Sequence, residues 1–153
     1  MAKKQRQTGR ISNRRARFDY ELGDSLLVGI KLSGKETKAL RFGHGQLNGA
    51  YVNVKDNELY LVNATITSGR GIDIPEDEQT RSRKLLAKRR EIDQLIVDKQ
   101  AGKTIVPLEI LNKERYIKLR IAAGKGKRQY DKRETIKRRQ QDREIARQTR
   151  TVR

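Results

Sequence analysis

The chain has 153 residues, with 37 Lys or Arg against 19 Asp or Glu and a formal net charge of +18. It has no Cys, one His and no apolar run long enough to cross a membrane. This composition excludes disulfides, thiolate metal sites and multi-histidine zinc sites. Its basic N-terminus lacks the apolar stretch of a secretory signal, so we expect a cytoplasmic protein with no membrane partner.

The positive charge is concentrated at the two ends of the chain. Residues 1–17 hold seven basic and no acidic side chains, and residues 124–153 hold twelve basic and four acidic ones. The segment between them carries 18 basic and 15 acidic residues, as an ordinary globular domain does. Basic ends on a nearly neutral body indicate a polyanion partner, with RNA or DNA as the first candidate. The alternative is a solvated tail that only aids solubility.

The first elements of the central segment are predicted strands. Residues 18–22 alternate apolar and polar side chains, as a half-buried strand does. Gly23 and Asp24 predict a turn, and residues 26–30 a more buried strand. Gly29 within that strand indicates a bulge or a close approach of another backbone.

Two helices are predicted. Ser33 and Glu36 have the spacing of a capping box, so a short helix should begin at Ser33 and end near residue 42. A longer helix is predicted over residues 81–100, followed by Gly102 as a C-terminal stop. The apolar residues that this longer helix should turn toward the core are Leu85, Leu86, Ile92, Leu95 and Ile96.

Two hairpins complete the body. One should join residues 51–54 to residues 59–64, and the other residues 105–111 to residues 116–121. Residues 67–80, which contain Gly and Pro, read as a loop. Six short strands with a few helices favour a mainly β protein. We therefore predict a small OB-like antiparallel barrel of about six strands with two or three flanking helices.

The C-terminal segment differs from the body in composition. Gly124 and Gly126 lie among cations, where they would let the backbone approach a phosphate closely. Residues 132–147 are rich in helix formers but have too few apolar side chains to bury a face. We expect a basic tail that is disordered alone and becomes helical on a polyanionic partner.

Four motifs occur in order along the chain. They are Asn-Arg-Arg-Ala-Arg-Phe-Asp-Tyr at residues 13–20, Gly-Lys-Glu-Thr-Lys-Ala-Leu-Arg at residues 34–41, Thr-Arg-Ser-Arg-Lys-Leu-Leu at residues 80–86, and Lys-Gly-Lys-Arg-Gln-Tyr-Asp-Lys-Arg at residues 125–133. Each motif is weak alone, but together and at these spacings they resemble the SmpB family. Its members are the SsrA-binding proteins that partner tmRNA in trans-translation.

The resemblance implies a mechanism of mimicry and positioning. An OB-like barrel would bind the tRNA-like domain of tmRNA near its D-loop, in place of a missing anticodon stem. The tail would enter the decoding centre and the empty mRNA channel of a stalled ribosome and become helical there. It implies a flexible basic arm over residues 1–12, a barrel over residues 13–123 and a tail over residues 124–153. Further implied partners are small-subunit rRNA and, indirectly, elongation factor Tu with alanyl-tmRNA, for a monomer without cofactors.

The family motifs also indicate which residues are expected to contact RNA. The residues matched to tmRNA binding are Asn13, Tyr20, Glu36, Lys38, Arg41, Arg83, Lys84, Lys118, Lys125, Lys127 and Arg128. Those matched to the decoding centre are Tyr130, Asp131, Lys132 and Arg133. A structural interpretation stays open for two of them, since Tyr20 fits a barrel wall and Glu36 the third helical position of a capping box.

Three positions depart from the family pattern, namely Leu27, His44 and Gln79. Two other classes of function are alternatives to this interpretation. A structural RNA-binding protein, such as a small ribosomal component, fits the composition equally well but not the motifs. An RNA-modifying enzyme would need a cofactor loop or an acid–base pair, and the sequence offers neither catalytic nor metal-ligating residues in such an arrangement.

Overall fold

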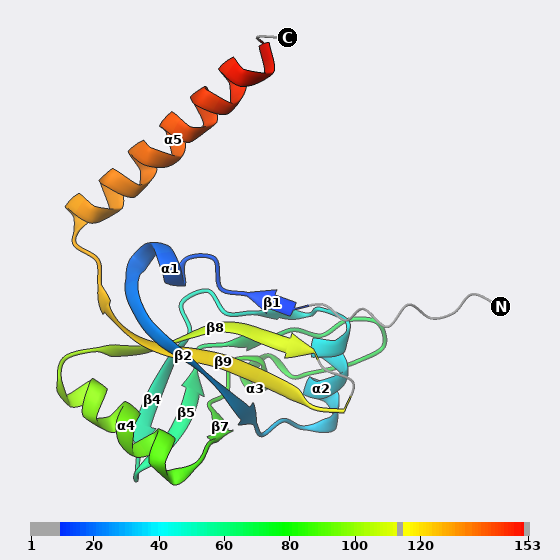
Figure 1. Cartoon of the computed structure of the whole chain (residues 1–153). Helices are drawn as coiled ribbons and strands as arrows, with labels where there is room; N and C mark the ends of the chain where they lie inside the picture. Colours follow the sequence, from blue (N-terminus) through cyan, green and yellow to red (C-terminus); the bar gives the residue numbers. More distant parts are fainter. Residues whose placement is uncertain (1–9, 113–114, 152–153) are drawn as a thin grey trace.

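Six antiparallel strands form a closed ring in the computed structural model, which describes residues 10–112 and 115–151. They are β2 (Tyr20–Ile30), β4 (Tyr51–Lys55), β5 (Glu58–Val62), β7 (Arg83–Leu86), β8 (Thr104–Asn112) and β9 (Ile117–Gly126). Their order is β8-β4-β5-β7-β2-β9, and β9 pairs again with β8 to close the ring (Figure 1). The predicted mainly β barrel of about six strands is confirmed.

Three further strands are attached to or near this ring. β1 (Arg10–Ser12) pairs with β8, so part of the segment predicted as an N-terminal arm is a strand. β3 (Gly45–Gln46) and β6 (Thr65–Ile66) form a separate two-stranded sheet. Residues 1–9 lie outside the described part of the chain.

The helices of the described residues differ greatly in length. They are α1 (Ala16–Asp19), α2 (Gly34–Arg41), α3 (Glu76–Gln79), α4 (Arg89–Gln100) and α5 (Gln129–Thr151). The predicted capping box of α2 is confirmed, because the Ser33 hydroxyl accepts from the Glu36 N–H and the Ser33 N–H donates to the Glu36 carboxylate. The one-turn helices α1 and α3 were not predicted.

The predicted hairpins are both present. β4 and β5 are joined by Asp56 and Asn57, whose φ angles of 52° and 59° are the left-handed values that a type I′ turn requires. β8 and β9 form the second hairpin, and its turn at residues 113 and 114 lies outside the described residues. Buried side chains of these strands, among them Leu59, Leu61, Ile105, Leu119 and Ile121, fill the barrel.

The helix predicted over residues 81–100 is wrong in its first part. Arg83–Leu86 is strand β7, held between β5 and β2, and helix α4 begins only at Arg89. The side chains of β7 alternate, so Leu85 is buried as predicted whereas Leu86 is 54% exposed. The adjacent apolar residues suggested a helical face, but the strand places them on opposite faces of the sheet.

The turn predicted at Gly23 and Asp24 is also wrong. β2 runs without interruption from Tyr20 to Ile30 and pairs with β9, with an irregular register between Leu22 and Ser25. The small residues there accommodate a bulge rather than a reversal of the chain. Phe18 and Asp19, assigned to a strand, belong to α1.

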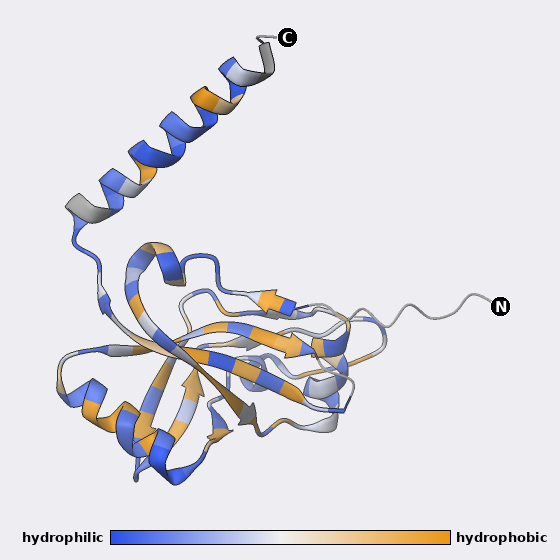
Figure 2. Cartoon of the chain, in the orientation of Figure 1, coloured by the Kyte–Doolittle hydropathy of each residue, from blue (hydrophilic) through white to orange (hydrophobic). Residues whose placement is uncertain are grey.

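The C-terminal segment leaves the barrel directly from β9. This strand continues to Gly126, and α5 begins three residues later and projects away from the ring (Figure 1). Figure 2 shows the coloured part of α5 as mostly hydrophilic, and its apolar residues Ile136 and Ile145 are 46% and 61% exposed. The change from a disordered to a helical tail on binding stays a prediction.

Candidate RNA-binding surface

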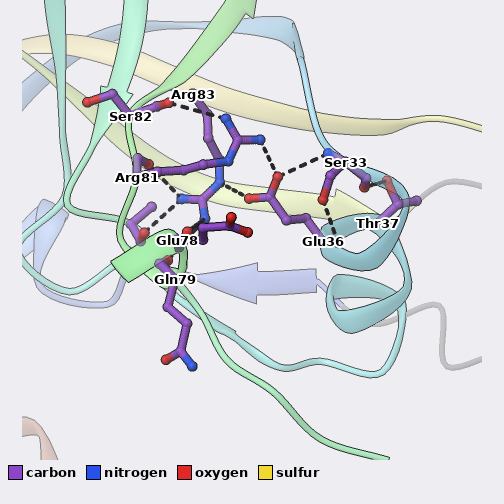
Figure 3. A network of polar contacts seen from close by, with 9 residues as sticks. Ser33, Glu36, Thr37, Glu78, Gln79, Arg81, Ser82 and Arg83 are labelled. Carbon is purple, nitrogen blue, oxygen red and sulfur yellow. Dashed lines mark hydrogen bonds and ion pairs between the residues drawn. The ribbon is translucent and has the colours of Figure 1, made fainter. Parts of the chain in front are cut away.

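A buried cluster of charged side chains ties α2 to β7 (Figure 3). Glu36 is 2% exposed, and its two carboxylate oxygens accept hydrogen bonds from Arg81 Nη2 and Arg83 Nε. The Ser33 N–H donates a further bond of 3.0 Å to Oε1. The carboxylate therefore links the first turn of a helix to a strand that begins 47 residues later in the chain.

Arg83 is fully buried and its donors are all used. Nε bonds to Glu36, Nη1 to the Ala64 and Arg81 carbonyl oxygens at 2.9 and 3.1 Å, and Nη2 to the Gln79 and Glu78 carbonyl oxygens at 3.0 and 3.4 Å. These account for the five N–H groups of a guanidinium. In this structure Arg83 holds the loop before β7 in place, and no donor remains for a phosphate.

The electrostatics of this cluster favour its ionised form. Burial alone would raise the pKa of Glu36, but the Ser33 N–H and the guanidinium groups of Arg81 and Arg83 outweigh burial and lower that pKa below its ordinary value. Burial lowers the pKa of Arg83, and the Glu36 carboxylate opposes that change. An arginine remains charged under these conditions, so the pair is ionic.

Asn13 is likewise an interior residue. It is 8% exposed. Its side-chain Nδ2 donates to the Pro107 carbonyl oxygen at 2.9 Å, and its backbone N–H donates to the Leu108 carbonyl oxygen at 2.7 Å. These bonds fasten the N-terminal segment to β8. Three nominated RNA contacts, Asn13, Glu36 and Arg83, are therefore occupied inside the protein.

The position of Tyr20 is compatible with both interpretations that the sequence left open, a residue of the barrel wall and an RNA contact. Its side chain is half-buried and packs against a small apolar cluster of Ala16, Val106, Leu108 and Ala122. Part of the ring thus belongs to the barrel wall.

The other residues predicted to bind tmRNA lie at the surface, four of them on the barrel and three at the start of the tail. Lys38 is exposed on α2, and Arg41 is half-buried at the end of the same helix. Lys84 and Lys118 are half-buried on β7 and β9, the strands on either side of β2. The second group is Lys125, Lys127 and Arg128, at the opposite end of β9 from Lys118 and thus about 23 Å away along the strand.

Arg81 was not among the nominated residues. Its guanidinium meets the Glu36 carboxylate, yet 40% of its side chain remains exposed. It lies in the same motif as Arg83 and Lys84. Its link to the buried cluster became visible only in the fold, where the Glu36 carboxylate binds the Arg81 guanidinium. No sequence pattern relates these residues, since they are 45 positions apart.

The base of the tail is fastened to α1. Lys132 Nζ lies 3.2 Å from Asp19 Oδ1, and the Lys127 N–H donates to the Asp19 carbonyl oxygen at 2.8 Å. Lys132 and Arg139 also lie within about 6 Å of the Phe18 ring centre. Burial would raise the pKa of Asp19, but Lys132 and then Arg15 lower it below its ordinary value.

Arg133 is exposed on α5 one residue after Lys132. The side chains of Tyr130 and Asp131 lie outside the described part of the structure. Within the described residues there is no helix long and apolar enough to cross a membrane. The same residues contain no group of three or more His, Cys, Asp or Glu that could hold a metal ion.

The family model described as SmpB protein matches residues 10–151. The chain belongs to the SmpB family. The SsrA-binding protein of Streptococcus suis (strain 98HAH33) is 40% identical over 141 residues, which cover 92% of this chain and 91% of the relative. That of Streptococcus pyogenes serotype M49 (strain NZ131) is 42% identical over 137 residues, covering 89% of this chain and 88% of the relative.

A solved structure also resembles this SmpB-family chain. It is described as "tmRNA-SmpB: a journey to the center of the bacterial ribosome" and aligns with a TM-score of 0.65 at 36% identity. The alignment covers 83% of this chain and 94% of that one. The fold and the sequence therefore agree on membership of the SmpB family, which is a family of RNA-binding proteins.

Proposed function

We propose that this protein binds the tRNA-like domain of tmRNA and delivers it to stalled ribosomes for trans-translation. The family match over residues 10–151 carries the proposal, because it spans both the barrel and the tail. The relatives named SsrA-binding protein and the tmRNA-SmpB structure support the same partner.

The surface cations divide this work between two regions. Lys38, Arg41, Lys84 and Lys118 lie on the barrel, and Lys125, Lys127 and Arg128 lie where β9 leads into the tail. Cations on a folded surface neutralise RNA phosphates and release counterions, which strengthens binding in a salt-dependent way. We assign tmRNA contact to both groups and the exposed part of Tyr20, and a positioning role to Asn13, Glu36 and Arg83.

The tail is assigned to the ribosome. Tyr130, Asp131, Lys132 and Arg133 lie at the start of α5, and we place them at the decoding centre against small-subunit rRNA. The rest of α5 would then follow the empty mRNA channel. The protein acts without catalysis or a cofactor, as a cytoplasmic monomer that joins elongation factor Tu only through alanyl-tmRNA.

Binding selectivity tests this function. Purified full-length protein should retard the tRNA-like domain of tmRNA in moderate salt, and an excess of a random RNA hairpin or duplex DNA should compete poorly. Equal affinity for all three nucleic acids would indicate a general polyanion binder and overturn the proposal.

A further inference from the structure

A hollow of about 410 Å³ lies where the end of β2, the start of α2, β5 and the start of β7 meet. Its wall includes Lys31, Ser33, Tyr60, Arg81, Ser82 and Lys84. Three of these side chains are cationic, one is aromatic and two are hydroxyl-bearing. None of the residues that line it is acidic, so within the described structure it is a positively charged recess.

The backbone brings the aromatic ring and the cations together. Tyr60 on β5 is directly opposite Lys84 on β7, so both side chains stand on the same face of the sheet. The Lys31 N–H donates to the Lys84 carbonyl oxygen at 2.9 Å, which places Lys31 beside Lys84 on the other side. The order Tyr60, Lys84, Lys31 across the hollow is therefore set by main-chain bonds.

The remaining wall is held by the buried charge cluster. Arg81 is fixed by the Glu36 carboxylate, and Ser33 caps α2 by accepting the Glu36 N–H at 3.2 Å (Figure 3). Because the same carboxylate binds the Arg81 guanidinium and the Ser33 N–H, Arg81 is already held at the recess before a ligand arrives. Preorganisation of this kind lowers the entropic cost of binding.

We propose that this recess binds one unpaired nucleotide of the RNA, with its phosphate against Lys31, Arg81 and Lys84 and its base stacked on Tyr60. The inference rests on the RNA-binding function proposed above and names a subsite within it. A volume of about 410 Å³ falls within the range of small-ligand sites. Proteins recognise unpaired bases by stacking them on aromatic rings next to a basic groove.

Direct binding of a small probe tests the subsite apart from tmRNA. The probe is a 5′-phosphorylated adenosine trinucleotide, titrated into isotope-labelled full-length protein and followed by nuclear magnetic resonance. The backbone signals of Tyr60, Ser82 and Lys84 should shift with the probe, and inorganic phosphate alone should shift them less. Shifts confined to the tail, or equal shifts with phosphate alone, would overturn the proposal of a nucleotide subsite.

Matched variants then separate stacking from charge. Tyr60→Leu should weaken binding of the trinucleotide and of the tRNA-like domain about tenfold, while Tyr60→Phe keeps the wild-type affinity because the ring remains. Tyr51→Leu is the control, since Tyr51 is exposed on the neighbouring strand β4 outside the hollow. Tyr60→Leu and Tyr51→Leu with the same affinity as wild type would exclude stacking in this recess.

The salt dependence of RNA binding shows whether a phosphate is held in the recess. The double variant Lys31→Gln with Lys84→Gln should reduce the slope of log affinity for the tRNA-like domain against log salt by about one to two, whereas Lys55→Gln on β4 should change it less. An unchanged slope would show that no phosphate is held there. If the wild-type protein did not prefer tmRNA to a random hairpin, the proposed function would be wrong. The shifts of the Tyr60 signals with the trinucleotide would still decide whether the subsite exists.

Discussion

Glu36 and Arg83 form an ion pair inside the protein, with 3% and 0% of their side chains exposed, although 47 residues separate them in the sequence. One partner sits in the first turn of α2 and the other begins β7. A buried carboxylate and guanidinium are costly to desolvate unless every polar atom finds a partner. Arg83 meets that condition with five hydrogen bonds, so the pair specifies how the helix and the strand are joined.

Removal of the Glu36 charge should destabilise the fold. Glu36→Gln leaves the buried Arg83 guanidinium uncompensated, and we expect a loss of about 3–5 kcal/mol in the free energy of unfolding, measured by urea denaturation. Asp93→Asn is the control, because its pair with Arg89 is more than half exposed on both sides and should contribute less than about 1 kcal/mol. Equal losses in the two variants would contradict the buried role of Glu36.

The Glu36 carboxylate should also make the stability of the fold depend on pH in the acidic range. The pKa of Glu36 is lower in the folded protein than in the unfolded chain, so the unfolded state binds more protons in the acidic range. Its stabilisation is complete above the unfolded pKa of about 4.3 and is lost as the pH falls through the lower folded value. Thermal unfolding of Glu36→Gln should therefore vary less below about pH 4.5 than that of wild type or Asp93→Asn. Parallel profiles would argue against this linkage.

Two glycines of β9 should respond differently to alanine. A Cβ at Gly124 would lie 2.6 Å from the Glu21 carbonyl oxygen, whereas a Cβ at Gly126 meets nothing within 4 Å. Gly124→Ala should therefore cost about 1–3 kcal/mol by forcing β2 and β9 apart, and Gly126→Ala should change stability by less than about 0.5 kcal/mol. Denaturant midpoints compare the two, and a neutral Gly124→Ala would show that the strands can move apart freely.

The ion pair between Asp19 and Lys132 should order the first turn of α5. Asp19→Asn removes the partner 3.2 Å from Lys132 Nζ, and we expect amide exchange in residues 129–133 to accelerate by up to about fivefold while the barrel is unchanged. Asp142→Asn, farther along the exposed helix, is the control. The effect should shrink in high salt, which screens exposed charges. Faster exchange across the barrel would mean instead that Asp19 supports the fold as a whole.

Deletion of residues 130–153 should divide the two proposed activities. The truncated protein retains the barrel together with Lys125, Lys127 and Arg128, so its binding to the tRNA-like domain in moderate salt should stay close to wild type. Tagging on stalled ribosomes, measured in a reconstituted translation reaction, should be abolished. If the truncation instead loses tmRNA binding, the tail contributes to RNA recognition and the assignment of roles is wrong.

The parts of this fold that depend only on residues close together in the sequence were predictable from the sequence. Ser33 and Glu36 are three positions apart, and the turn at Asp56 and Asn57 joins adjacent strands, so local rules suffice for both. The strand at Arg83–Leu86 was missed because its identity depends on pairing with β5 and β2, which are distant in sequence. The pattern of Leu85 and Leu86 fits a helix until those neighbours are known.

The candidate site shows the same limit. Sequence motifs identified Glu36 and Arg83 as important but suggested contact with RNA, because burial depends on the tertiary fold. Arg81 and Tyr60 could not be related to each other at all, since the recess that both line arises only when β5, β7 and α2 meet. The cations of the tail needed no such information, because a helix without an apolar face exposes nearly every side chain.

Strand β9 is hydrogen-bonded along both edges, to β2 on one side and to β8 on the other, and α5 follows it after two residues. A load applied along the tail would therefore be resisted in shear by two ladders of hydrogen bonds at once, rather than peeling a single edge strand. At 23 residues, α5 is a lever about 35 Å long that extends from a strand held on both edges.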